Sequence, residues 1–491
     1  MEDNKTIDTK LEEKKSTVVK DDFILTDELR KKALEKPTFK ILYVGDGDTR
    51  LSPFRGESML KTFSNMYAKH AHIELHTASS NFMHSINLEM LKYYNVLWLD
   101  NISDFKTAKN LADLQAQLMQ ELVPNWDKEL EALEGKEEES KEYVKFLDKT
   151  RISKLHVIYS LDEFIWDAPV GRSCDIQTVQ LIETYIKISD SIIVPTVELK
   201  EAMTYYKFVP FNKDIYVIPS SVSVDFFPLF KNFMRKGKAE VAQLREKPNV
   251  LIKGLTVPKN IESFILENYK KMQITLCSID EINDHIKFLL EKKKINHIYH
   301  WANPYVNKSN LLSTYALERD AGFDFVIHTK PDNMRGNMYE ISTGDEDILF
   351  SIAYGAIPIC GIDHLGYDEN TKHLATISKK TFGKDTPSKK IANIIETLQT
   401  PVVFNEIFSK CKQEVEHRIS NSPLIGARYF NIMLGKELSK ARSLLAKEKR
   451  NEIEKEIKEK DNQEKDSQEK DSQENVNDVP NNIIKGNFNK G

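Results

Sequence analysis

The chain has 491 residues, of which 40% are hydrophobic and 30% charged, and its formal net charge is -5. This size allows two domain cores with extensions, and the balance of acid and base argues against a nucleic-acid-binding face made by bulk charge. The four cysteines have no paired spacing, so neither a zinc site nor a disulfide framework is indicated. No apolar run reaches the roughly 18 residues of a membrane span, and a cytoplasmic protein is expected.

The first half of the chain alternates strands with helices. Residues 1–37 form a polar N-terminal extension with a short helix over 26–34, and Pro37 precedes a buried strand over 39–44. Further strands are predicted over 72–76, 95–100, 155–160, 190–196 and from residue 215. Alternation of this kind predicts a parallel sheet, here a Rossmann-like domain over 38–222 with a Glu- and Lys-rich helical insertion over 101–150.

A second α/β series repeats this pattern over residues 223–404. Its predicted strands cover 249–252, 274–277, 298–301, 325–328 and 357–360. Helices are expected over 405–447, and the tail over 448–491 is almost wholly charged. Three near-identical pentads begin at Glu459, Glu464 and Glu469. Because they contain nothing apolar to bury, disorder or a fraying solvated helix is expected there.

Two short segments resemble a known family. Ile192-Ile193-Val194-Pro195-Thr196 is followed by Val217-Ile218-Pro219 and by Val224-Asp225-Phe226-Phe227. Both are similar to the hinge side of GT-B glycosyltransferases of the group 1, family 4-like type that phages or polysaccharide clusters encode. The resemblance implies two Rossmann-like domains facing each other across a cleft, with the first binding the acceptor and the second the donor. It also implies a nucleotide-diphosphate sugar as substrate, no permanently bound cofactor and no essential metal.

The acceptor side is predicted at the end of the first strand. Gly45 and Gly47 would let the backbone approach a ligand, Asp46 lies between them, and Arg50 or Arg55 could meet an anion. A plain tight turn is the alternative, and no third glycine follows at the spacing of a dinucleotide-binding motif.

The catalytic candidates are the neighbouring acids Asp162 and Glu163, just past the strand over 155–160. Ser160 to Pro169 is similar to the "D-D-x-x-x-x-x-P" segment of some GT-B enzymes. Carboxylates there can accept hydrogen bonds from sugar hydroxyls or act as a base. The alternative is that Asp162 caps the following turn.

The donor side is predicted around the second series of strands. Lys253 and Lys259 could neutralise a departing diphosphate, although loop lysines are usually solvated. His300 and Trp301 follow a strand where the family often contacts the nucleotide base, and core packing explains Trp301 equally well. Ser342 or Thr343 would begin a helix near the diphosphate.

The match is incomplete over residues 337–361. Phe350 lies where the family usually has a carboxylate, and Asp347 lies where a lysine is common. The sequence therefore predicts a hexosyltransferase-type glycosyltransferase acting on a carbohydrate or other acceptor, with a catalytically inactive GT-B-like protein as the alternative. Such a protein could be a phage virion component whose charged tail binds a protein partner. An epimerase acting on nucleotide sugars is a weaker alternative.

Overall fold

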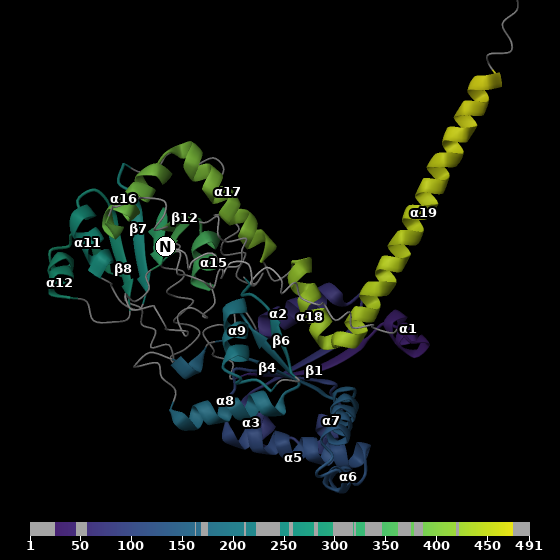
Figure 1. Ribbon diagram of the computed structural model, residues 1–491. Helices are drawn as coiled ribbons and strands as arrows, with labels where there is room; N and C mark the ends of the chain where they lie inside the picture. The colour runs from purple at the N-terminus through teal and green to yellow at the C-terminus, as the bar shows by residue number, and fades with distance from the viewer. Residues whose placement is uncertain are drawn as a thin grey trace, which may run out of the picture. The chain divides into compact units, whose positions relative to one another are not determined.

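The structure, a computed structural model, divides into two compact units (Figure 1). The larger runs from Pro37 to Met433, and the smaller joins the described residues before Pro37 to those from Leu434 onward. The residues that the structure describes are 25–45, 56–162, 164–167, 175–210, 213–221, 246–254, 259–278, 283–297, 318, 321–328, 346–361, 375–377, 386–418 and 422–474.

The first sheet of the larger unit has six parallel strands in the order β2-β1-β3-β4-β5-β6. This confirms the parallel α/β sheet predicted for the first half of the chain. The strands are β1 (Thr38–Gly45), β2 (His72–Ala78), β3 (Val96–Asp100), β4 (His156–Ser160), β5 (Ser191–Val194) and β6 (Asp214–Val217).

Helices cover both faces of this sheet. One face packs into a core with α5 (Phe105–Leu122), α8 (Ile176–Ile188) and α9 (Val197–Tyr205). Each of these helices begins with a side-chain cap, as when Thr196 Oγ1 accepts a hydrogen bond from the Leu199 amide at 3.1 Å, so the predicted cap is confirmed. The short helices are α3 (Ser80–Met83), α4 (Leu88–Leu91) and η1 (Ile165–Asp167).

The opposite face of the first sheet meets α2 (Glu57–Tyr67) and, from far along the chain, α18 (Pro423–Leu434). Trp98 of β3 stacks on Tyr429 of α18 with ring centroids 5.4 Å apart, and Phe39 meets Phe430 edge to face. Figure 1 shows α2 and α18 on one side of this sheet and α5 and α8 on the other. Helix α18 thus belongs to the packing of the first sheet.

The predicted insertion is helical. Helix α5 is followed by α6 (Trp126–Ala132) and α7 (Glu137–Ile152), and α7 packs on α5 before the chain enters β4. Its Glu- and Lys-rich surface is solvated, with ion pairs such as that between Lys141 and Glu137 at 3.0 Å.

The second sheet also has six parallel strands, in the order β12-β11-β10-β7-β8-β9. Counted from β7, this is the strand order of a Rossmann fold, so two Rossmann-like sheets are confirmed. Their arrangement across a cleft stays a prediction. The strands are β7 (Asn249–Gly254), β8 (Gln273–Ser278), β9 (Asn296–His297), β10 (Phe325–His328), β11 (Ile357–Gly361) and β12 (Ala375–Ile377).

Two separate cores lie against this sheet. One includes α11 (Lys259–Asn268), α12 (Asp284–Glu291) and α16 (Pro387–Leu398), and the other includes α15 (Glu346–Ala353) and α17 (Pro401–His417). The strand β12 has no counterpart among the predicted strands. Strand β9 ends at His297, so the predicted strand over 298–301 lies outside the described residues.

The smaller unit pairs α1 (Asp27–Leu34) with α19 (Lys436–Glu474). Arg30 forms an ion pair with Glu448 at 3.1 Å, and Arg442 donates to the carbonyl oxygen of Glu35, so the two helices run antiparallel. The helix α19 runs through the three pentads as far as Glu474, and the tail after it lies outside the described residues. None of the helices in the described part of the chain combines the length and the apolar character that a membrane crossing requires.

Candidate active site

Each sheet has one point where its strand order reverses. In the first sheet this point lies between β1 and β3, and in the second between β7 and β10. Open α/β sheets bind ligands outside the carboxyl ends of their strands at such points. We call the side of a sheet where its strands end the carboxyl edge, and the side where they begin the amino edge.

A buried phenol and a buried carboxylate meet at the reversal point of the first sheet. The Tyr43 hydroxyl donates to Asp100 Oδ2 at 2.5 Å, and each residue is only 4% exposed. Asp100 ends β3 directly opposite Gly45, the last residue of β1. Burial, reinforced by the Asp100 carboxylate, raises the pKa of Tyr43 far above its ordinary value, so this phenol stays a neutral donor.

Two glycines make room for this pair. A Cβ atom on Gly56 would lie 2.5 Å from both Asp100 Oδ2 and the Tyr43 hydroxyl, and one on Gly45 would lie 2.7 Å from that hydroxyl. Gly56 also has φ +70, which favours glycine. Gly45 and Gly56 therefore both pack against Tyr43.

Asp162 joins this cluster from β4. It lies two residues past the end of the strand, is 4% exposed, and its charge adds to the rise in the pKa of Tyr43. The first carboxyl edge thus brings together two carboxylates, Asp100 and Asp162, with one phenol. Of the residues predicted here, Gly45 and Asp162 are in the cluster, and the others, Asp46, Gly47, Arg50, Arg55 and Glu163, lie outside the described residues.

An ion pair occupies the reversal point of the second sheet. Lys253 Nζ lies 2.9 Å from Glu318 Oε1 and 3.2 Å from Oε2, and the two side chains are 5% and 0% exposed. Lys253 is opposite His328 of β10 and Cys277 of β8. The prediction placed Lys253 just after a strand that ends at 252, but β7 continues to Gly254, and this puts the lysine inside the sheet. The solvated loop lysine considered as an alternative is therefore wrong.

The same carboxylate has further buried neighbours. The Tyr354 hydroxyl donates to Glu318 Oε2 at 3.3 Å, and Cys277 Sγ lies 3.9 Å from Oε1. Burial, reinforced by Glu318, raises the pKa of Tyr354 well above its ordinary value. Phe350 meets the Tyr354 ring edge to face and is 1% exposed, so the position where the resembled family has a carboxylate belongs to the core in this chain.

Lys259 contrasts with Lys253. It is exposed at the first residue of α11, beyond the carboxyl end of β7. The remaining predicted donor residues, His300, Trp301, Ser342 and Thr343, lie outside the described residues, and so does the side chain of Asp347.

A polar network at the amino edge of the first sheet has a structural role. Arg151 forms an ion pair with Asp190, whose Oδ2 also accepts from the Val157 amide at 2.8 Å. His156 Nε2 lies 2.8 Å from Ser191 Oγ, and burial lowers the pKa of His156. These groups join the starts of β4 and β5 and lie at the opposite edge from Asp100 and Asp162.

Sequence reasoning missed Tyr43, Asp100, Glu318 and Tyr354. Asp100 carried a usable signal, because an acid that ends a buried parallel strand lies at the edge where ligands bind. Within the described ranges, no group of three or more His, Cys, Asp or Glu side chains is arranged to hold a metal ion. At the first sheet, the carboxylates of Asp100 and Asp162 can accept a proton or bind hydroxyl groups. At the second sheet, Lys253 places a cationic group within the sheet.

No protein-family model matches the sequence, and no curated protein matches it. Among solved structures, HepE from Anabaena in complex with UDP and glucose is 11% identical, over 83% of this chain and 98% of its own, with a TM-score of 0.40. A glycosyltransferase from Rickettsia africae is 13% identical, over 82% and 98%, with a TM-score of 0.42. An alpha-glucosyltransferase in complex with UDP and a 13-mer DNA is 10% identical, over 81% and 100%, with a TM-score of 0.43. Identities and TM-scores this low do not indicate an activity for this chain. The order and direction of the strands in the two sheets define the fold.

Proposed function

We propose that the protein is a glycosyltransferase that moves a sugar from a nucleotide-diphosphate donor to a hydroxyl-bearing acceptor without an essential metal. The observation that carries the proposal is the group of buried polar side chains at the reversal point of the first sheet, Tyr43, Asp100 and Asp162. Buried polar groups are retained where they are hydrogen-bonded or functional. The resemblance of residues 160–169 and 190–227 to GT-B enzymes supports the same class.

In this reaction the acceptor hydroxyl attacks the anomeric carbon of the donor, and the bond from that carbon to the diphosphate oxygen breaks. Asp162 takes the hydroxyl proton or orients the reacting sugar, while the Tyr43–Asp100 pair fixes the backbone around it. The negative charge stays on the departing diphosphate, which requires fixed cations nearby. The remaining roles follow the sequence prediction: Glu163 beside Asp162, Gly45 to Arg55 at the acceptor, and Lys253, Lys259, His300, Trp301, Ser342 and Thr343 at the donor.

Lys259 is the stronger candidate for the diphosphate cation, because it is exposed. Lys253 would have to exchange the Glu318 carboxylate for a phosphate, and the charge that it offers a ligand is offset by Glu318. The two lysines are therefore expected to differ in function: replacing Lys259 weakens nucleotide binding directly, whereas replacing Lys253 disturbs the fold of the second sheet.

A second candidate is a GT-B-like protein that binds partners without catalysis. Two observations favour it: Lys253 is neutralised by Glu318, and Phe350 is buried where the resembled family has a carboxylate. Thermal unfolding of the full chain with uridine, guanosine and adenosine diphosphate sugars separates the candidates. One nucleotide at 100 times its Kd stabilises a transferase by about 2.7 kcal/mol. No shift with any of them at millimolar concentration would favour the non-catalytic protein.

A further inference from the structure

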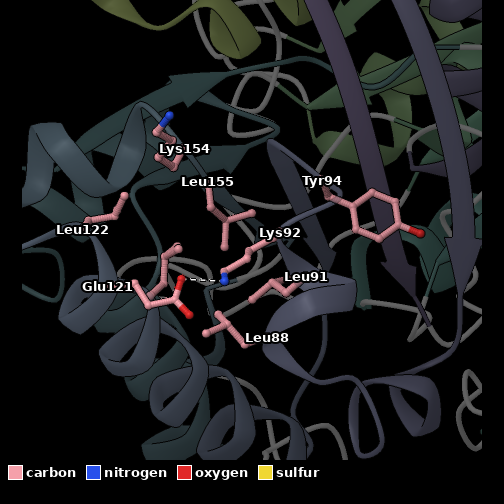
Figure 2. Close-up of a pocket in the computed structure, with 9 residues that line it drawn as sticks. Leu88, Leu91, Lys92, Tyr94, Glu121, Leu122, Lys154 and Leu155 are labelled. Atoms are coloured by element: carbon pink, nitrogen blue, oxygen red, sulfur yellow. Dashed lines mark ion pairs between the residues drawn. The ribbon is translucent and has the colours of Figure 1, made fainter.

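A pocket of about 250 Å³ lies at the amino edge of the first sheet. Tyr94 and Leu155, which line it, come just before β3 and β4. Because β3 spans five residues at about 3.3 Å each, the pocket is roughly 15 Å from Asp100 and has no part in the active site proposed above. Its lining residues are Leu88, Leu91, Lys92, Tyr94, Leu118, Glu121, Leu122, Lys154 and Leu155 (Figure 2).

The lining of the pocket is apolar where it is buried and charged where it is exposed. Leu91, Leu118 and Leu155 form the floor and are at most 6% exposed. Leu88 and Leu122 are partly buried and pack against the same core, so they form walls. Such a lining favours an apolar ligand, because each buried methylene is stabilised by leaving water whereas a polar group would lose its hydrogen bonds.

The charges at the rim differ in their availability. Lys92 lies 2.5 Å from Glu121 and 2.9 Å from Glu89, and Figure 2 shows its ammonium turned toward Glu121. Both acids are thereby engaged by one lysine. Lys154 is exposed, and within the described residues no ion pair includes it. Lys154 is therefore the lining cation that no described carboxylate engages.

We propose that this pocket binds a single alkyl chain that carries a carboxylate, with the chain among the leucines and the carboxylate beside Lys154. An apolar cavity of about 150 Å³ binds benzene, with six carbons, so about 250 Å³ suits a ligand of roughly eight to ten carbons. Octanoate has this size and charge. The site is independent of the glycosyltransferase proposal.

A chain-length series tests the proposal. The full chain is titrated calorimetrically with butanoate, hexanoate, octanoate and dodecanoate, each below its micelle concentration. Affinity is expected to rise about fourfold for each added methylene up to octanoate and to level off beyond it, because the pocket is then full. Absence of binding, or a rise that continues unchanged through dodecanoate, would overturn the proposal.

Three variants locate the ligand. Leu122→Trp fills the pocket from its partly exposed wall and should weaken octanoate binding at least tenfold while thermal unfolding stays unchanged. Lys154→Ala should weaken octanoate binding severalfold without affecting octanol, and Lys145→Ala, at an exposed lysine of α7, should affect neither. Unchanged octanoate binding in Leu122→Trp rules out this pocket. Equal effects of the two lysine variants rule out the carboxylate contact.

Discussion

Glu318 accepts hydrogen bonds from Lys253 on both carboxylate oxygens, at 2.9 Å and 3.2 Å, in a part of the second sheet from which water is almost wholly excluded. Removing two charges from water costs several kcal/mol per ion, and only a close partner offsets that cost. The charge of the lysine that the sequence assigns to a ligand is therefore already matched by a carboxylate within the fold. Because Lys253 is paired with Glu318, replacing Lys253 is expected to change the stability of the fold, whereas nucleotide binding is expected to depend on other cations.

Breaking the Lys253–Glu318 pair from one side should destabilise the protein strongly. Lys253→Met leaves the Glu318 carboxylate buried without its cation, and we expect a loss of about 3–5 kcal/mol in the free energy of unfolding, measured in urea. Lys259→Ala, at an exposed position, should change it by less than about 0.5 kcal/mol. Similar effects of the two substitutions would show that the ion pair does not form.

Tyr43→Phe should destabilise the first sheet. It removes the donor to Asp100 Oδ2 while the carboxylate stays buried, so we expect a loss of about 1.5–3 kcal/mol. Tyr205→Phe, on a side chain that is 80% exposed, is the matched control and should be neutral. Chemical denaturation measures the free energy of unfolding of both variants. An unchanged free energy of unfolding in Tyr43→Phe would mean that the hydrogen bond from the phenol to Asp100 does not stabilise the fold.

Gly56→Ala tests how tightly the backbone at Gly56 packs on Tyr43 and Asp100. A Cβ atom there would lie 2.5 Å from two oxygen atoms, and φ 70 with ψ -135 is itself a backbone conformation that essentially only glycine adopts. Gly135→Ala shares a positive φ of +86 but has nothing within 4 Å of the added carbon, so it should cost only about 1–2 kcal/mol. Gly56→Ala should cost clearly more, and equal losses in the two unfolding free energies would contradict the packing described here.

The N-cap of α5 should give a stability that depends on pH. Burial acts to raise the pKa of Asp104, but hydrogen bonds from the backbone of Thr107 and from His84 outweigh it and hold the pKa below the ordinary value of about 3.9. Just below pH 4 the unfolded chain therefore binds more protons at Asp104 than the folded chain does. The stabilisation of the folded state by the Asp104 charge is complete above that pH. It is lost as the pH falls through the pKa that Asp104 has in the folded state.

Asp104→Asn keeps a capping side chain but removes the charge. It should lower the free energy of unfolding by about 0.5–1 kcal/mol at pH 7, and its difference from the wild type should shrink as the pH falls below 4. Urea unfolding at pH 7, 5, 4 and 3.5 measures this. A difference that stays constant over the series would show that the Asp104 charge contributes nothing.

Much of the fold could be predicted from local patterns. Ten of the strands were expected close to where they lie, because short β-branched runs bounded by Pro, Gly and helix caps mark them in the sequence. Asp162 was singled out as an acid just past a strand end, and it is buried at that carboxyl edge. The strand β12 was missed, because three residues are too few for a pattern.

The partners of the site residues could not be predicted in the same way. Tyr43 is 57 positions from Asp100 and looks like any aromatic of a buried strand, and Glu318 is 65 positions from Lys253. The pairing of β1 with β3 brings Tyr43 to Asp100, and Glu318 reaches Lys253 from outside the strands, through tertiary packing. The strand β7 runs two residues further than predicted, through Lys253 to Gly254, and this places the lysine inside the sheet.

The most direct test of the proposed function follows release of the nucleoside diphosphate from the sugar nucleotide that stabilises the protein, in the full chain and in Asp162→Asn. We expect the wild type to release it and the variant to bind the nucleotide with unchanged affinity while its turnover falls at least a hundredfold, consistent with the loss of a general base. A wild-type chain that binds no sugar nucleotide, or an Asp162→Asn variant that turns over at the wild-type rate, would contradict the account.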